Sequence, residues 1–184
     1  FDLERTTPMH EWHVENQALF EDVGQWKRAW YYTKEKENFT EALNREVKAT
    51  RDSLGILDAS TLGKIDIQGR DVSEFLNRIY TNAWSKLEIG KCRYGVMLGD
   101  DGMIIDDGVT TRLGEYHYIM STTTGNAASV MSKLEDWLQT EWPELEVYLT
   151  SVTEQYGTIS LNGPNSRKLM KKLNPEYDFS KDNF

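Results

Sequence analysis

The sequence predicts an α+β fold with a largely antiparallel sheet, and three observations support this prediction. Segments with strand and helix periodicity are interleaved along the 184 residues. Successive strand segments are joined by short turns, the clearest being Gly99–Gly102, where Asp and Gly tolerate the positive φ of a tight hairpin. Two helices fall within about residues 60–150, so this middle unit resembles a ferredoxin-like arrangement with both helices over one face of the sheet.

Residues 1–39 contain large aromatic side chains without helical or strand periodicity. We expect an extended N-terminal arm with short helical pieces there, followed by a partial domain over residues 40–184. Two interpretations of the aromatic residues remain open. They either hold the arm on a core formed elsewhere, or they line an interface, where Trp, Tyr and Arg are enriched.

The next elements are predicted from capping signals and periodicity. Thr40 is a candidate N-cap for a helix that runs to Arg51, with Gly55 as its stop signal. Apolar residues alternate over Leu62–Gln68, which indicates a half-buried strand. Apolar residues recur at helical spacing over residues 70–80, which indicates an amphipathic helix.

Beyond the central hairpin, strand and helix signals continue to alternate. A third strand is expected over Tyr116–Thr122, and a helix begins near Asn126 and ends before Pro143. Two further strands are expected over residues 145–150 and 156–161, and a last helix begins with Gly163-Pro164.

Composition excludes several classes of function. Thirty acidic residues against 21 basic ones give a net charge of −9, which argues against nucleic acid as a partner. No apolar run approaches the roughly 20 residues of a membrane span, and the N-terminus is too polar for a signal peptide. We therefore expect a cytoplasmic protein without membrane association.

Metal and nucleotide chemistry also lack sequence support. Cys92 is the single cysteine, and the three histidines have no further ligands at metal-binding spacing, so no metal site is expected. No glycine-rich phosphate motif or serine-nucleophile motif occurs. The chain begins at Phe1 without methionine, and we expect it to be a piece of a longer polypeptide.

The second run of the hairpin ends in the carboxylate pair Asp106-Asp107. Because neighbouring strand residues point to opposite faces, one of the two lies on the apolar side, where a carboxylate needs a partner or a ligand. Acidic residues around hairpins are more often solvated turn residues, which is our interpretation of Asp100 and Asp101. Asp107 lies beyond the turn, so it is the candidate functional acid.

Several strings resemble the aminomethyltransferase (glycine-cleavage T-protein) family. Tyr94 and Asp107 flank the hairpin with the spacing of that family's folate-binding hairpin, and Ile159–Pro164 resembles its A-L-x-G-P turn. The strings Val23–Arg28, Tyr80–Trp84 and Leu138–Pro143 resemble, more specifically, the carboxy-terminal half of the α subunits of heterotetrameric sarcosine oxidases.

This resemblance implies a tetrahydrofolate site. In such enzymes sarcosine is oxidised at a flavin in the β subunit. The product meets tetrahydrofolate in the T-protein-like half of the α subunit, giving glycine, 5,10-methylenetetrahydrofolate and hydrogen peroxide. The resemblance also implies FAD, FMN and NAD in the complete complex, and a hetero-oligomer with a flavin-bearing β subunit.

The resemblance further implies roles for individual residues. Asp107 matches the folate-proximal carboxylate, which can stabilise a cation and accept a proton as the folate nitrogen attacks. Tyr94 matches an aromatic residue beside the folate, and Leu62 replaces a methionine at the pterin wall. The strand that supplies further side-chain contacts matches Tyr118, Thr122 and Thr123, although T-protein has asparagine near Thr122.

One family segment, T-G-E-x-G-F/Y, carries a glutamate that holds the pterin, and it does not occur in this sequence. We therefore expect the chain to provide half of a folate site. Three alternatives remain open: a stand-alone tetrahydrofolate-dependent aminomethyltransferase or demethylase, a non-catalytic folate-binding module, and an interaction lobe that docks a flavin-bearing subunit. The sequence does not identify the amine.

Overall fold

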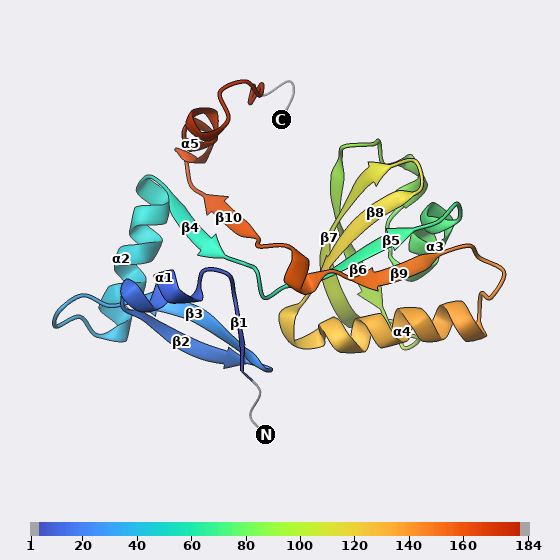
Figure 1. Cartoon of the computed structure of the whole chain (residues 1–184), viewed down its shortest axis with the longest axis horizontal. Helices are drawn as coiled ribbons and strands as arrows, with labels where there is room; N and C mark the ends of the chain where they lie inside the picture. Colours follow the sequence, from blue (N-terminus) through green and yellow to red (C-terminus); the bar gives the residue numbers. More distant parts are fainter. Residues whose placement is uncertain (1–3, 181–184) are drawn as a thin grey trace. The chain divides into compact units, whose positions relative to one another are not determined.

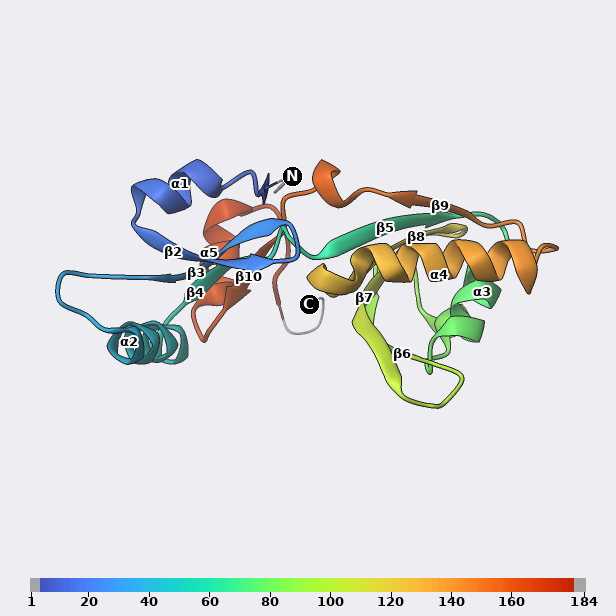
Figure 2. The same ribbon diagram turned by 90° about the horizontal axis from the view of Figure 1, so that it is seen from below.

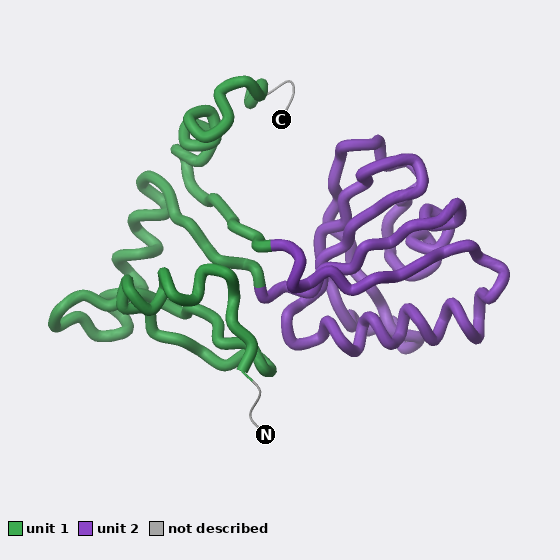
Figure 3. The backbone as a smooth tube through the Cα atoms, viewed as in Figure 1, with its two compact units in different colours: residues 1–60, 157–184 green, residues 61–156 purple. Residues whose placement is uncertain are grey.

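The computed structural model describes residues 4–180 (Figure 1). It divides into two compact units, shown in Figure 3: unit 1 comprises residues 1–60 and 157–184, and unit 2 is Thr61–Tyr156. Unit 1 is therefore built from two separate stretches of chain. The boundary expected between residues 39 and 40 falls inside unit 1.

Unit 1 begins with a small sheet instead of an extended arm. Helix α1 is followed by an antiparallel hairpin, and a short first strand pairs in parallel with the second strand of that hairpin. Gly24 takes a φ of 61° in the turn, a backbone conformation that glycine adopts without strain. These elements are β1 (Arg5–Thr6), α1 (His10–Glu15), β2 (Ala18–Val23) and β3 (Trp26–Tyr32).

The predicted helix after residue 39 is present, but its N-cap is Asn38 and not Thr40. The Asn38 side chain accepts a hydrogen bond from the Glu41 N–H at 3.1 Å, and the Glu41 carboxylate accepts one from the Asn38 N–H at 2.9 Å. This reciprocal capping box fixes the start of the helix. The remaining elements of unit 1 are α2 (Phe39–Asp52), the antiparallel pair β4 (Gly55–Asp58) and β10 (Ile159–Asn162), and α5 (Ser166–Leu173).

Unit 2 is a five-stranded antiparallel sheet with the order β6-β7-β8-β5-β9. Its strands are β5 (Gly63–Gln68), β6 (Cys92–Leu98), β7 (Ile104–Gly114), β8 (His117–Thr122) and β9 (Tyr148–Ser151). Its helices are α3 (Val72–Ile79) and α4 (Ala127–Thr140), with the 3₁₀ turns η1 (Trp84–Lys86), η2 (Thr124–Asn126) and η3 (Thr153–Gln155). The α+β class with a largely antiparallel sheet is thus confirmed.

Both long helices of unit 2 lie on the same side of the sheet (Figure 2). The apolar residues that recur along α3 are buried, and they pack with the inward residues of the sheet and of α4. This core includes Ile65, Ile67, Phe75, Leu76, Met97, Tyr118, Met120, Val130 and Leu134. Neither α3 nor α4 covers the other face of the sheet, which we call the outer face.

Candidate functional site

The register of β6 and β7 places the two carboxylates of the hairpin on opposite faces. Asp106 lies opposite Met97, and Asp107 lies opposite Val96. Met97 is fully buried in the core, and only 4% of Asp106 is exposed, so Asp106 is on the helix-covered face. Asp107 is half-buried on the outer face. The prediction that one acid of the pair lies on the apolar side is confirmed.

Asp106 has a structural partner. The backbone N–H of Thr123 donates to both carboxylate oxygens of Asp106, at 3.3 and 3.4 Å. Next to this contact, the Asn126 side-chain amide donates to the Ile105 carbonyl at 2.6 Å. Burial raises the pKa of the Tyr80 phenol, and the nearby Asp106 carboxylate raises it further. Asp106, which lies in β7, thus holds the segment that follows β8.

Asp107 forms a different pair on the outer face. The Tyr94 hydroxyl donates to Asp107 Oδ2 at 2.9 Å, and 55% of the Tyr94 side chain is exposed. This hydrogen bond, with smaller contributions from burial and the negative charge of Asp107, raises the pKa of the Tyr94 phenol. The hydrogen bond fixes one carboxylate oxygen, and the other oxygen of Asp107 has no hydrogen-bond partner among residues 4–180. The arrangement can therefore accept a proton or face a cation from solution.

Ser121 belongs to the same outer face, because its neighbour Met120 points into the core. The Val109 N–H donates to Ser121 Oγ at 2.9 Å, and the Ser121 hydroxyl donates to the Val109 carbonyl at 3.1 Å. A Cβ on Gly108 would lie 1.9 Å from the Ser121 carbonyl oxygen, so only glycine permits this close approach. Sequence analysis missed Ser121, although strand alternation alone places it on this face.

The other predicted site residues lie elsewhere. Tyr118 is fully buried on the core face with its hydroxyl 2.8 Å from Ser73 Oγ, and Thr122 is 1% exposed on the same face, opposite Gly63. Leu62 is half-buried just before β5, and Thr123 is exposed just after β8. The structure therefore brings together Tyr94 and Asp107, and it does not bring Tyr118 or Thr122 to them. The outward residues of β8 are His117, Ile119 and Ser121, and of these Ser121 is nearest to Asp107, because it lies next to Val109, two residues along β7.

Among residues 4–180, no three His, Cys, Asp or Glu side chains gather as metal ligands. None of the helices in this range combines the length and apolar character needed to cross a bilayer.

Comparisons with known proteins give a consistent family. The model of the GCVT N-terminal domain family matches residues 9–184. Sarcosine oxidase subunit alpha of Corynebacterium sp. (strain U-96) is 59% identical over 183 residues, which cover 100% of this chain and 19% of that protein. The subunit alpha of Rhizobium meliloti (strain 1021) is 44% identical over 94% of this chain and 18% of its own length. The chain thus spans less than two thirds of these relatives.

More distant relatives extend the same pattern. An aminomethyltransferase of Pseudothermotoga lettingae is 32% identical over 95% of this chain and 45% of its own length. The crystal structure of glycine cleavage system aminomethyltransferase T from Bartonella henselae matches with a TM-score of 0.80. That match covers 95% of this chain and 46% of the other at 24% identity, so it supports the fold alone.

Proposed function

Because the chain belongs to the GCVT N-terminal domain family, we propose that it is the T-protein-like, tetrahydrofolate-binding part of a sarcosine oxidase α subunit. The observation that supports a site in this chain is the Tyr94–Asp107 hydrogen bond on the outer face of unit 2. The chain is 59% identical to a sarcosine oxidase subunit alpha and 32% identical to an aminomethyltransferase. This higher identity supports the choice over a stand-alone aminomethyltransferase.

The outer face fits one wall of a folate site. It offers an exposed aromatic ring in Tyr94, apolar surface in Val109, and a carboxylate that can accept a hydrogen bond or a proton. A flat heterocycle with N–H donors needs such a combination of ring and acceptor. Bound tetrahydrofolate supplies the nucleophilic nitrogens that take up the one-carbon unit.

In this proposal Asp107 is the catalytic residue. Its carboxylate lowers the free energy of the cationic imine that arrives after amine oxidation. It then accepts the proton that the attacking nitrogen loses. Tyr94 is a positioning residue, because its hydroxyl holds Oδ2 and leaves the other oxygen for the reaction. Leu62 and Thr123 remain candidate contacts, and they lie at the same end of the antiparallel pair of β5 and β8, because Gly63 pairs with Thr122.

The remaining parts of the reaction are assigned to the complete enzyme. We propose that sarcosine is oxidised at a flavin in a partner β subunit, with FAD, FMN and NAD held outside this chain. The relatives are named as subunits, which supports a multi-subunit assembly. We further propose that the assembly is cytoplasmic, a hetero-oligomer, and without nucleic acid or membrane partners.

Exchange of Asp107 for asparagine in the complete heteromeric enzyme tests the proposal. We expect Asp107→Asn to lower the formation of 5,10-methylenetetrahydrofolate by about 100-fold or more, the range of a lost general base. Sarcosine consumption and peroxide formation should stay close to the wild type, because the flavin lies in another subunit. Product assays with and without tetrahydrofolate separate the two activities.

The matched control is Asp136→Asn, an exposed carboxylate on α4 in the same unit. It should leave both activities unchanged. If Asp107→Asn behaved like this control, or if Asp106→Asn alone gave the folate-specific loss, Asp107 would not be the catalytic acid. A stand-alone aminomethyltransferase would instead show folate-dependent transfer without any flavin-bearing partner.

A further inference from the structure

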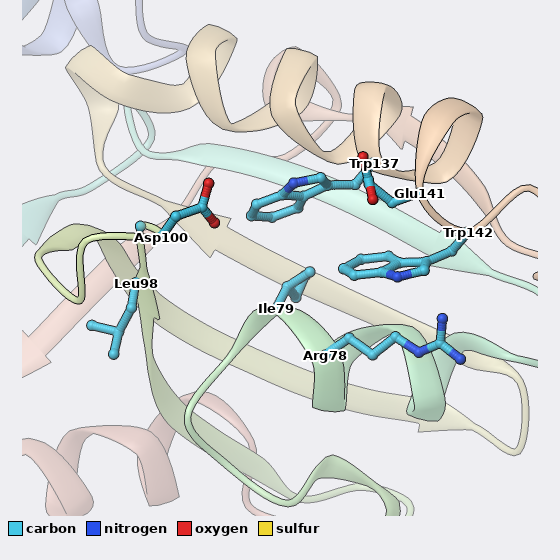
Figure 4. Close-up of a pocket in the computed structure, with 8 residues that line it drawn as sticks. Arg78, Ile79, Leu98, Asp100, Trp137, Glu141 and Trp142 are labelled. Atoms are coloured by element: carbon cyan, nitrogen blue, oxygen red, sulfur yellow. The ribbon is translucent and has the colours of Figure 1, made fainter.

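A pocket of about 480 Å³ lies in unit 2 on the helix-covered side of the sheet (Figure 4). The end of α3, the hairpin residues Leu98–Asp100 and the C-terminal end of α4 form its walls. A cavity of this volume suits a small organic molecule. Asp107 points to the outer face, so the pocket is separate from the proposed folate surface.

Two indole rings form one wall of the pocket. Trp137 and Trp142 have ring centroids 5.8 Å apart with their planes tilted by 39°, and Figure 4 shows them side by side next to Ile79. Cations of the chain already lie on both rings: Lys133 Nζ is 4.7 Å from the Trp137 centroid, and the Arg78 guanidinium is 5.3 Å from the Trp142 centroid. The indoles of this wall therefore interact with positive charge.

Lys133 lies on Trp137 but does not line the pocket, and among the charged residues that do line it the uncompensated charges are negative. Arg78 forms ion pairs with Glu74 at 3.0 Å and with Glu144 at 3.3 Å, so its positive charge is already balanced. Asp100 and Glu141 also line the pocket, and neither carboxylate has a hydrogen bond or ion pair with the described residues. Figure 4 shows Asp100 at one end of the indole wall and Glu141 next to Trp137.

From this combination we propose that the pocket binds a small organic cation, specifically a methylated ammonium compound. Indole faces attract a cation best when it gives up little hydration, and methyl groups weaken the hydration of an ammonium. Ile79 offers an apolar contact for the methyl groups, and Asp100 and Glu141 supply the opposite charge. A hydrated metal cation gains little from the indoles, and an anion is repelled by the two free carboxylates.

Choline and its uncharged isostere 3,3-dimethylbutan-1-ol are the probes that test this proposal. Each is titrated into the ¹⁵N-labelled 184-residue chain while the indole N–H signals of Trp137 and Trp142 are followed by NMR. We expect choline to shift both signals along a saturable curve and the isostere to leave them in place. Equal shifts by both compounds, or no shift with choline, would overturn the proposal.

Variants then test the charges and the rings separately. Glu141→Gln should weaken choline binding about fivefold, the effect of one nearby charge in a largely aqueous setting. Its matched control is Glu135→Gln, an exposed carboxylate earlier on α4 that does not line the pocket and should bind choline like the wild type. Trp137→Leu keeps an apolar wall without the π face, so it should abolish the preference for choline over the isostere. The assignment is contradicted if Glu141→Gln binds choline as tightly as the wild type, or if Trp137→Leu still prefers choline over the isostere.

Discussion

The two units bury different kinds of side chain. Unit 2 encloses a continuous apolar core between its sheet and its two helices, with residues such as Phe75 and Leu134 fully buried. The described part of unit 1 buries few apolar side chains, among them Trp26 and Ala42, and its buried polar residues include His13 and Asp58. Apolar burial thus holds unit 2 together, whereas hydrogen bonds between specific polar groups hold much of unit 1.

The polar centre of unit 1 is a chain of three side chains. His13 Nε2 lies 2.9 Å from Asp58 Oδ2, and His13 Nδ1 lies 2.6 Å from the Tyr32 hydroxyl. Because an ionised carboxylate only accepts, His13 Nε2 carries a proton and donates to Asp58. The Ser60 N–H donates to the other Asp58 oxygen at 3.0 Å. These contacts connect α1, β3 and β4 within unit 1.

The largest effect is expected from opening the core of unit 2. Phe75→Ala should lower the free energy of unfolding by about 3–5 kcal/mol, because it removes a fully buried ring and leaves a cavity. The matched variant in unit 1 is Phe39→Ala, whose ring is 41% exposed and packs on Trp30 and Tyr31. It should cost about 1 kcal/mol. Urea unfolding followed by circular dichroism measures both, and equal losses would contradict the difference between the units.

The next effect concerns the polar centre of unit 1. His13→Phe keeps a ring in the buried position but removes both hydrogen bonds, so it should cost about 2–3 kcal/mol. His117→Phe is the control in unit 2, because His117 pairs with Asp66 at a more exposed position. It should cost less than about 1 kcal/mol. A His13→Phe variant as stable as His117→Phe would show that the polar centre contributes little.

A third, smaller effect is the pH dependence that Asp58 confers on unit 1. Burial raises the pKa of the Asp58 carboxyl, but hydrogen bonds from Ser60, Thr7 and His13 outweigh burial and hold the pKa below its usual 3.8. A depressed pKa stabilises the folded state above the unfolded pKa, and this stabilisation is lost as the pH falls through the folded value. Stability should therefore fall less between about pH 5 and pH 2 in Asp58→Asn than in the wild type. Urea unfolding at each pH measures the free energy of unfolding of both proteins. If it fell equally in the wild type and in Asp58→Asn, Asp58 would not confer this pH dependence.

Unit 2 could be predicted from the sequence far better than unit 1. Periods of 2 and 3.6 residues located β5, α3 and α4, because each of these elements buries one apolar face in the same core. The hairpin β2–β3 was missed, since aromatic residues on both faces hide the alternation of its strands. Thr40, the predicted N-cap, does not cap α2, because the reciprocal hydrogen bonds between Asn38 and Glu41 start the helix two residues earlier.

The candidate site shows a similar limit. Strand alternation separated Asp106 from Asp107, and the register confirms that separation. Tyr118 and Thr122 were proposed from matching strings, which carry no information on the face to which a side chain points. Their even spacing with the buried Met120 places both on the core face, and the same count places Ser121 on the outer face, which it shares with Asp107.

The smallest effect is expected on the outer face of unit 2, because its side chains are not packed in the apolar core. The Asp107 carboxylate raises the pKa of the Tyr94 phenol above its usual 10.0, chiefly through the hydrogen bond that Tyr94 donates. Asp107→Asn removes the negative charge, so the pKa of Tyr94 should fall toward 10.0 while the unfolding midpoint stays in place. Tyr116 is an internal control, because Glu115 raises its pKa in the same way and is untouched by the variant. Residue-specific ¹³C NMR titration of the tyrosine rings resolves both groups. If Tyr94 and Tyr116 titrated as in the wild type, the outer-face pair would not form in solution, and the proposed positioning of Asp107 by Tyr94 would be wrong.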